Sequence, residues 1–298
     1  MIGTEDRSDT PAPLQDDILK QSWYHTIALR DGTSTNGIFD TRAAASRLVW
    51  PEQIRGGRCL DAGTCDGFWA FEMERQGAGE VIAVDVGHAN DVDRPWAARQ
   101  RDLPTPHQPW ATRAARGFQL ASSALNSHVK RLECSVYDLD PALHGHFDVV
   151  FTGTLLMHLR DPILALERIR AVCSGHLVMI ECVDAFLDMV RPGQASARLE
   201  PAAGQWWRGN RKALTGALRI AGFEELSVSR PFVTPFGAAI TGGRNPLRRT
   251  LAAMTAIINR WPILASAPVL VQVIGLLSGT YDIAITAKPS APALPPRR

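Results

Sequence analysis

The chain is predicted to fold as an α/β protein with a doubly wound, mostly parallel, seven-stranded sheet of Rossmann-like type. Three observations support this prediction. Short apolar segments alternate with amphipathic ones along most of the 298 residues. A glycine-bearing turn at residues 61–67 separates an apolar segment from a helical one. Acidic residues follow several predicted strands, which is where such sheets bind ligands.

The composition is that of an ordinary globular protein, with 45% hydrophobic and 21% charged residues. A net charge of +2 gives no bulk basicity for nucleic acid, although local arginines could still form a basic face. The five cysteines have no CxxC spacing, which favours buried thiols in a reducing compartment over disulfides or a metal site. The polar, acidic N-terminus lacks a signal peptide's apolar segment, and no apolar run resembles a transmembrane helix. A cytoplasmic location is therefore expected.

The rest of the chain is organised around residues 58–86. An apolar strand ends at Asp61, a helix is predicted over residues 68–76, and a second buried strand over residues 81–84 ends at Asp85. The unit is thus a strand, a turn, a helix and a strand, with a carboxylate at the end of each strand.

The turn in this unit has the pattern Asp61-x-Gly63-x-x-Asp66-Gly67. Glycine lets the backbone approach a ligand closely. A dinucleotide-binding turn would place a pyrophosphate at the helix N-terminus, but two carboxylates repel that group and suit a cationic ligand. Asp85 can accept hydrogen bonds from ribose hydroxyls. A turn that uses glycine without binding any nucleotide is the alternative.

This turn and Asp85 resemble motif I and the ribose-binding acid of the class I methyltransferases that use S-adenosylmethionine (SAM). The resemblance implies SAM as the cofactor. It places the SAM ammonium near Asp61, the ribose at Asp85 and the adenine at Asp138, although Asp138 could equally cap the next turn. The implied cofactor-binding residues are Asp61, Gly63, Thr64, Asp66, Asp85, Asp138 and Thr152.

Residues 1–50 are predicted to form an N-terminal cap, with helices at 14–30 and 41–49. Trp23-Tyr24-His25-Thr26-Ile27, with Asp31-Gly32 and then Gly37-Ile38-Phe39-Asp40, resembles the branch related to tRNA wobble-uridine methyl- and carboxymethyltransferases. In that branch a similar segment covers the cofactor and substrate mouth.

That resemblance makes Trp23 and Tyr24 candidate substrate-binding residues, although aromatic side chains equally often anchor a helix on a core. Carboxymethyl-transferring relatives hold their cofactor's extra carboxylate with a lysine in this segment. Between Tyr24 and Phe39 this chain has Arg30 and no lysine, which favours ordinary SAM.

The methyltransferase domain is predicted to span residues 51–290. Its further strands are expected at residues 129–135, 147–151, 177–181, 223–229 and 281–287, and its further helices at 117–127, 162–172 and 212–221. Asp161 followed by Pro162 fits a helix N-cap with proline at the first position. Residues 87–116 and 184–210 are expected to be loops.

A helical insertion is expected at about residues 235–280, before the last strand. It begins with a basic amphipathic stretch and continues with an apolar one. Such a segment suits packing on the sheet, a homodimer contact or a peripheral membrane contact. Pro262 and Pro268 argue against a helix that spans a membrane.

Two histidines are candidate catalytic residues. His158 follows the fourth strand, and His25 lies in the cap; either imidazole could serve as a general base near neutral pH. Trp206 and Trp207 are candidate substrate-binding residues, with simple packing as the alternative.

The predicted function is SAM-dependent methyl transfer to an O, N or C atom of a small-molecule acceptor, either a natural product or lipid-related. The alternatives are a tRNA wobble-uridine methyltransferase, a non-catalytic SAM-binding subunit and, less favoured, a dinucleotide oxidoreductase.

Overall fold

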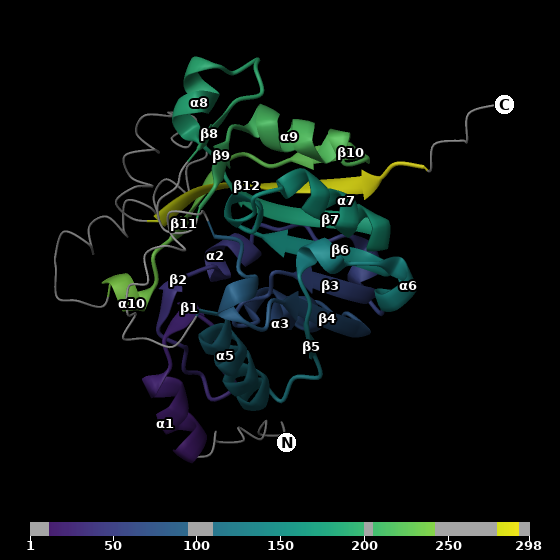
Figure 1. The fold of residues 1–298 in the computed structure, drawn as a ribbon. Helices are drawn as coiled ribbons and strands as arrows, with labels where there is room; N and C mark the ends of the chain where they lie inside the picture. The colour runs from purple at the N-terminus through teal and green to yellow at the C-terminus, as the bar shows by residue number, and fades with distance from the viewer. Residues whose placement is uncertain (1–11, 95–109, 200–204, 242–278, 292–298) are drawn as a thin grey trace, which may run out of the picture.

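The computed structural model describes residues 12–94, 110–199, 205–241 and 279–291 (Figure 1). Its main sheet has the order β10-β12-β7-β6-β3-β4-β5, which runs from top to bottom in Figure 1. The strands are β3 (Arg58–Ala62), β4 (Glu80–Asp85), β5 (Lys130–Glu133), β6 (Phe147–Gly153), β7 (Cys173–Cys182), β10 (Phe223–Val228), β11 (Phe232–Pro235) and β12 (Gly279–Pro289).

The sheet confirms the predicted doubly wound, mostly parallel architecture. Strands β5, β4, β3, β6 and β7 are mutually parallel, and β12 is antiparallel to both β7 and β10. The strand order reverses between β3 and β6, which is the switch point where such sheets bind ligands. The described sheet has eight strands instead of the seven predicted, because β11 pairs with the first part of the long β12.

Helices cover both faces of the sheet. The α-helices are α1 (Ala12–Lys20), α2 (Arg42–Ala45), α3 (Phe68–Arg75), α5 (Trp110–Leu125), α6 (Pro141–His144), α7 (Pro162–Val172), α8 (Ala185–Val190), α9 (Arg211–Ile220) and α10 (Ala238–Thr241). Short 3-10 turns are η1 (Glu52–Ile54), η2 (Ala89–Asp91), η3 (Val136–Asp138) and η4 (Leu156–His158). Two small sheets pair β1 (Trp23–His25) with β2 (Gly37–Phe39) and β8 (Ala197–Leu199) with β9 (Trp207–Gly209).

The alternating side chains of the central strands form two hydrophobic cores. In β6, Val150 faces the core that α7 and α9 complete, whereas Val149 and Phe151 face the core made with α3, α5 and β1. Each fully buried side chain of this size contributes about 1.5–3 kcal/mol through burial. The two cores therefore hold the carboxyl ends of the parallel strands in fixed positions.

The N-terminal cap differs from the prediction. The expected helix over residues 14–30 ends at Lys20, and Trp23–His25 is the strand β1, which runs parallel to β2. The carboxylate of Asp66 accepts the backbone N–H groups of Tyr24 and His25, which removes them from any helix. The second predicted helix is also shorter, since α2 covers Arg42–Ala45 of the expected residues 41–49.

Two glycines were interpreted as helix or strand boundaries and instead lie inside elements. Gly117 is within α5, where a Cβ atom would come 3.1 Å from Cβ of Asp66. Gly175 is within β7, where a Cβ atom would collide with the backbone of Asp148. In both cases glycine permits a close approach of two elements and ends neither.

The predicted bounds of one helix agree with the structure. Helix α7 covers the predicted residues 162–172, and the Asp161 side chain accepts a hydrogen bond from Leu164 N. The expected loop over residues 87–116 is wrong at its end, because α5 begins at Trp110. Most of the predicted insertion lies outside the described residues, which include its start, with α10, and its last residues in β12. Among the described residues, no helix combines the length and apolar character needed to cross a membrane.

Gly67, the N-cap of α3, provides a test of how α3 packs against α5. Its φ is +94°, and a Cβ atom there would lie 2.5 Å from the Phe71 ring and 2.7 Å from the Phe118 ring. Gly67→Ala should therefore destabilise the fold by roughly 2–5 kcal/mol, the sum of left-handed strain and overpacking. Urea unfolding followed by circular dichroism measures the loss.

Gly77→Ala is the matched control, because Gly77 has the same φ of +94° with no atom within 4 Å of the added Cβ. Gly77→Ala should lower the free energy of unfolding only by the backbone strain, about 1–2 kcal/mol. Equal losses in the two variants would contradict the packing described around Gly67.

Candidate cofactor and acceptor site

The carboxyl ends of β3, β4, β6 and β7 meet at one edge of the sheet. Asp61 is near the end of β3, Asp85 ends β4 and Thr152 is near the end of β6. The cap strands β1 and β2 and helix α10 lie at this same edge, at the left of Figure 1. The edge therefore combines the cofactor-binding candidates with the N-terminal segment.

Three buried polar atoms at this edge have no hydrogen-bond partner among the residues that the structure describes. They are Oδ2 of Asp61 and the hydroxyl oxygens of Thr64 and Thr152, and each of these residues is 1% exposed. An unsatisfied buried polar group costs about 1–3 kcal/mol, so native proteins contain few of them. Three together indicate a place that a polar ligand completes.

The carboxyl of Asp61 is the titratable group among these three. Burial raises its pKa to about 7, and the nearby Asp85 adds to that rise. The adjacent Thr64 hydroxyl, whose geometry falls short of a hydrogen bond, and the positive charge of His25 favour the ionised form without offsetting burial. A buried carboxylate of this kind gains most from a cationic ligand.

The turn after β3 has the backbone shape that the motif requires. Gly63 has a φ of +85°, and the backbone N–H groups of Gly63 and Thr64 both donate to the carbonyl oxygen of Val84. Cys65 also has a positive φ, of 55°. A Cβ atom on Gly63 would come 3.0 Å from a methyl group of Leu155, so this turn lies directly against the segment that follows β6.

Asp85 is tied to the same turn. Its Oδ2 accepts the Cys65 N–H at 2.7 Å, and its Oδ1 accepts the Val86 N–H at 2.8 Å. Burial raises the pKa of the Asp85 carboxyl, and these two N–H groups partly oppose the rise. Each carboxylate oxygen keeps a further lone pair for a ligand hydroxyl.

Asp66, the second carboxylate of the turn, is fully engaged by the cap. Its Oδ2 accepts the N–H groups of Tyr24 at 2.8 Å and His25 at 2.9 Å, and its Oδ1 lies 2.5 Å from Nδ1 of His25. The structure thus brings His25 to the turn, and it gives Asp66 a positioning role that the sequence pattern did not indicate.

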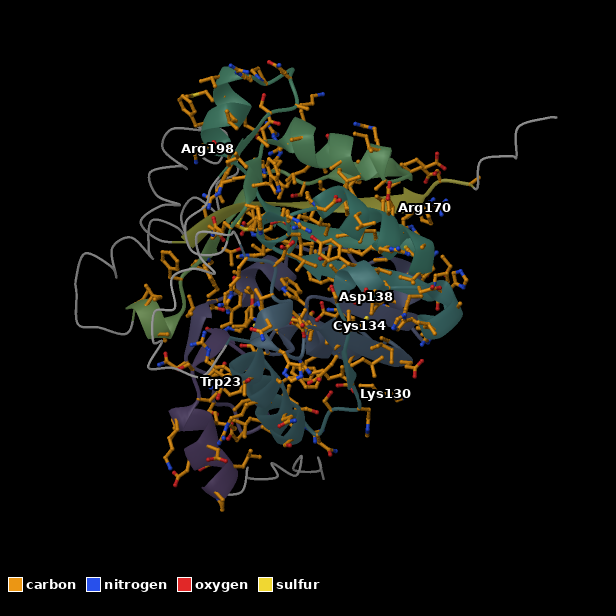
Figure 2. The ribbon with its side chains drawn as sticks, in the orientation of Figure 1. Trp23, Lys130, Cys134, Asp138, Arg170 and Arg198 are labelled. Carbon is orange, nitrogen blue, oxygen red and sulfur yellow. The ribbon has the colours of Figure 1, made fainter. Side chains whose placement is uncertain are left out.

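Asp138 is exposed at the end of η3, beyond β5 (labelled in Figure 2). It does not cap the following turn, because Asp140 accepts the Ala142 N–H there. The neighbouring Tyr137 hydroxyl donates to Asp93 at 3.0 Å, and Asp93 also accepts the Arg160 N–H. Asp93, which sequence reasoning did not single out, therefore joins the segments that follow β4, β5 and β6.

His158 lies on η4, the short turn that follows β6. The η4 turn is held by Glu181 of β7, whose Oε2 accepts the Leu156 N–H at 2.9 Å. Glu181 is 2% exposed, and burial raises the pKa of its carboxyl to about 8, although its two backbone N–H partners oppose the rise.

A second buried carboxyl, Asp282 of β12, lies opposite Cys182 of β7. It accepts hydrogen bonds from the Cys182 thiol and the Thr280 hydroxyl, and burial raises its pKa. The Tyr24 hydroxyl has its pKa raised by burial and then by Cys65, Cys182 and Asp282, which places Tyr24 between the cofactor turn and β7. Sequence reasoning missed Glu181 and Asp282; an acidic residue within an otherwise apolar strand was the available signal.

The four aromatic candidates separate into two groups. Trp23 is a core residue: it is 2% exposed, and its indole N–H donates to Ile18 O at 2.9 Å, so it is not available to a substrate (Figure 2). Trp206 and Trp207 lie beside η4 and the residues that follow it. The backbone N–H of Trp206 donates to Met157 O, and the Trp207 indole donates to Arg160 O.

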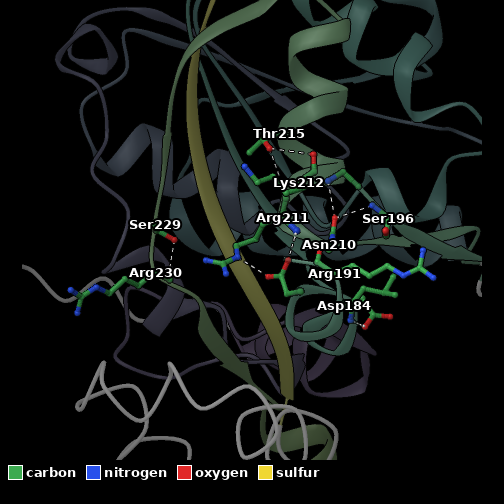
Figure 3. A network of polar contacts seen from close by, with 12 residues as sticks. Asp184, Arg191, Ser196, Asn210, Arg211, Lys212, Thr215, Ser229 and Arg230 are labelled. Carbon is green, nitrogen blue, oxygen red and sulfur yellow. Dashed lines mark hydrogen bonds and ion pairs between the residues drawn. The ribbon is translucent and has the colours of Figure 1, made fainter. Parts of the chain in front are cut away.

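A polar network joins α8 and the start of α9 to the segment that leads into β8 (Figure 3). Asn210 caps α9 by accepting the Ala213 N–H, accepts the Ser196 N–H, and donates to Arg191 O and Gln194 O. Arg211 pairs with Asp188 of α8 at 2.6 Å. Residues 184–210, expected to be a loop, therefore form α8 and the β8–β9 hairpin, docked against α9.

A family model described as a methyltransferase domain matches residues 38–228. The chain belongs to this methyltransferase family. The match confirms the predicted enzyme class, a SAM-dependent methyltransferase, and with it the predicted cofactor; it does not distinguish the wobble-uridine branch.

Solved structures agree on the fold of this methyltransferase. The N-terminal domain of EvdMO1 with S-adenosylhomocysteine (SAH) bound has a TM-score of 0.55 and 15% identity, over 96% of this chain and 100% of that one. The same domain in the presence of SAH and D-fucose has a TM-score of 0.51 and 16% identity, over 93% and 95% of the two chains. A comparison with curated proteins gave no significant match.

The buried carboxyls make the stability of the ligand-free methyltransferase depend on pH. The pKa values of Asp61 and Glu181 are raised in the folded state, to about 7 and about 8, from about 4 in an unfolded chain. Their contribution is complete below pH 4 and is lost as the pH rises through those folded values. The unfolding temperature should therefore fall as the pH rises from about 4 to about 8.

Asp61→Asn removes one of the two ionisations. At pH 4 its unfolding temperature should match that of the wild type, and at pH 9 it should exceed it, as measured by differential scanning fluorimetry without ligand. An identical pH dependence in both proteins would show that Asp61 is not the buried acid described here.

Proposed function

We propose that this protein transfers the methyl group of SAM to a small-molecule acceptor at the carboxyl edge of its sheet. The observation that carries the proposal is the unpartnered, buried Oδ2 of Asp61 beside a glycine turn, at the switch point of the sheet. The donors and acceptors present there fit SAM, which offers an ammonium, a ribose and an adenine to three separate parts of the edge.

We assign each part of the cofactor to residues at this edge. Asp61 would bind the ammonium, and the left-handed backbone at Gly63 would let the methionine part lie against the turn. The remaining lone pairs of Asp85 would accept the ribose hydroxyls, and Asp138 the adenine amino group. The hydroxyl of Thr152 would gain the partner that it lacks within the protein. SAM supplies an activated methyl group when bound.

The acceptor is proposed to lie between the cap and the segment after β6. We assign Tyr24 of the cap to the acceptor side, and Trp206 as well, because its backbone N–H donates to Met157 O of η4. Because methyl transfer is an in-line displacement, the protein acts mainly by holding donor and acceptor in line, and His158 would remove a proton where the acceptor has one to lose.

Transfer of a labelled methyl group from SAM tests this function. Total RNA and a small-molecule extract are offered in separate reactions, and hydroxylated compounds are included because the similar EvdMO1 domain was crystallised in the presence of D-fucose. Label in the small-molecule fraction alone is expected, and mass spectrometry would identify the product. Label in RNA would replace the proposal with a tRNA methyltransferase, and binding without transfer would indicate a non-catalytic subunit.

Asp61→Asn should weaken SAH binding by roughly tenfold to a hundredfold, because it removes a charge-assisted hydrogen bond in a buried place. Isothermal titration calorimetry measures the affinity at pH 8. Asp16→Asn is the control, since Asp16 is an exposed carboxylate on α1, far along the chain from the turn. An unchanged affinity in Asp61→Asn would remove Asp61 from the cofactor site.

His158→Ala should lower kcat by roughly a hundredfold or more while the affinity for SAH stays constant, as expected for loss of a general base. His146→Ala, which changes an exposed histidine, should leave both unchanged. Turnover equal to that of the wild type in His158→Ala would show either that another group takes the proton or that the acceptor needs no base.

A further inference from the structure

The imidazole of His25 is held in one orientation by the cofactor turn. Its Nδ1 lies 2.5 Å from Oδ1 of Asp66, and both side chains are buried, with 7% and 3% exposure. Asp66 is itself fixed, because its other oxygen accepts two backbone N–H groups of β1. A carboxylate so placed makes Nδ1 a donor, and in the imidazolium form Nε2 carries a second proton that can be donated.

The second ring nitrogen, Nε2, is left for a ligand. Among the residues that the structure describes, none forms a hydrogen bond with Nε2 of His25, whereas Nδ1 is satisfied by Asp66. The ring is clamped between Phe68, whose centroid is 5.4 Å away, and Tyr24, whose centroid is 4.7 Å away. A rotation of the ring that turned Nε2 toward the backbone would therefore break the contacts with both Phe68 and Tyr24.

His25 and Asp61 place opposite charges beside the same turn. Asp61 has an unpartnered oxygen, and His25 is close enough for its charge to favour ionisation of that carboxyl. An ammonium and a carboxylate bonded to one carbon atom would match this pair. The first helical turn of α3, which starts at Phe68 with no side-chain cap, adds the positive end of a helix dipole on the same side.

We propose that His25, oriented by Asp66, binds the α-carboxylate at the amino-acid end of the cofactor while Asp61 binds its ammonium. This inference rests on the proposed function, and it assigns His25 to cofactor recognition instead of proton abstraction from the acceptor. Asp66 is then a positioning residue that couples the cap to the cofactor. Ordering of the cap and binding of the amino-acid end become one event.

The alternative for these side chains is a metal ion, since ligand atoms of His25, Cys65 and Asp66 lie within 4.8 Å of one another. The hydrogen bond between His25 and Asp66 argues against it, because it uses one potential ligand atom on each residue. The cofactor's carboxylate instead needs only Nε2, which that hydrogen bond leaves available.

Two ligands separate the amino-acid end from the rest of the cofactor. SAH carries the amino-acid end, whereas 5′-methylthioadenosine keeps the adenosine and sulfur and lacks it. His25→Asn retains a donor toward Asp66 and removes Nε2. It should weaken SAH binding by about tenfold to a hundredfold and leave the affinity for 5′-methylthioadenosine within about twofold.

Asp66→Asn retains an acceptor for the cap's N–H groups but no longer presents a carboxylate to Nδ1 of His25. It should lower SAH affinity in the same selective way, which keeps the proposal testable if His25→Asn folds poorly. His128→Asn is the matched control, because His128 is an exposed histidine at the start of the segment before β5. It should change neither affinity.

Calorimetry with both ligands, repeated in the presence of a chelator, distinguishes the outcomes. Equal weakening of both ligands in His25→Asn would indicate a purely structural role and overturn the proposal. Unchanged SAH affinity would overturn it in favour of a role in proton transfer, and loss of wild-type affinity on chelation would overturn it in favour of a metal. Failure of the wild type to bind either ligand would instead overturn the proposed function itself.

Discussion

The carboxylate of Asp66 joins two parts of the chain that lie 41 residues apart in the sequence. It holds the strand β1 against the turn that follows β3, and it orients His25 at the same time. Without this contact the N-terminal segment would have no polar anchor at the cofactor turn. The close packing of Gly117 in α5 against Asp66 depends on the same position. One side chain thus sets the relation between the cap, the turn and the helix beside them.

Around this anchor the protein concentrates buried acids at one edge of its sheet. Asp61, Glu181 and Asp282 are each at most 2% exposed, and burial raises the pKa of each carboxyl. Glu181 and Asp282 have donors from the protein, but Asp61 keeps an oxygen without one. Such a group lowers the stability of the ligand-free fold, and proteins commonly retain destabilising groups of this kind where a ligand binds.

Much of this arrangement follows from local sequence. The glycine turn, the carboxylates at the ends of β3 and β4, and the capped helix α7 all depend on residues close together in the chain, and each was predicted correctly. The strand that contains Trp23 was not predicted, because Asp66 binds the backbone of this segment and removes it from the helix. The burial of Trp23 likewise depends on contacts with Ile18 and α5. Glu181 and Asp282 were missed for a similar reason: their significance arises only when β7 and β12 pair. Sequence patterns therefore located the glycine turn and its carboxylates, whereas the proposed acceptor side depends on contacts between distant segments.

The central claim is that Asp61 is an uncompensated buried acid that a cationic ligand completes. The most direct test is the number of protons released when SAH binds, measured by calorimetry in buffers of different ionisation enthalpy. With a pKa of about 7 for Asp61, the wild type should release about half a proton more than Asp61→Asn at pH 7, and the difference should vanish by pH 9. Equal proton release by the two proteins at both pH values would contradict the account.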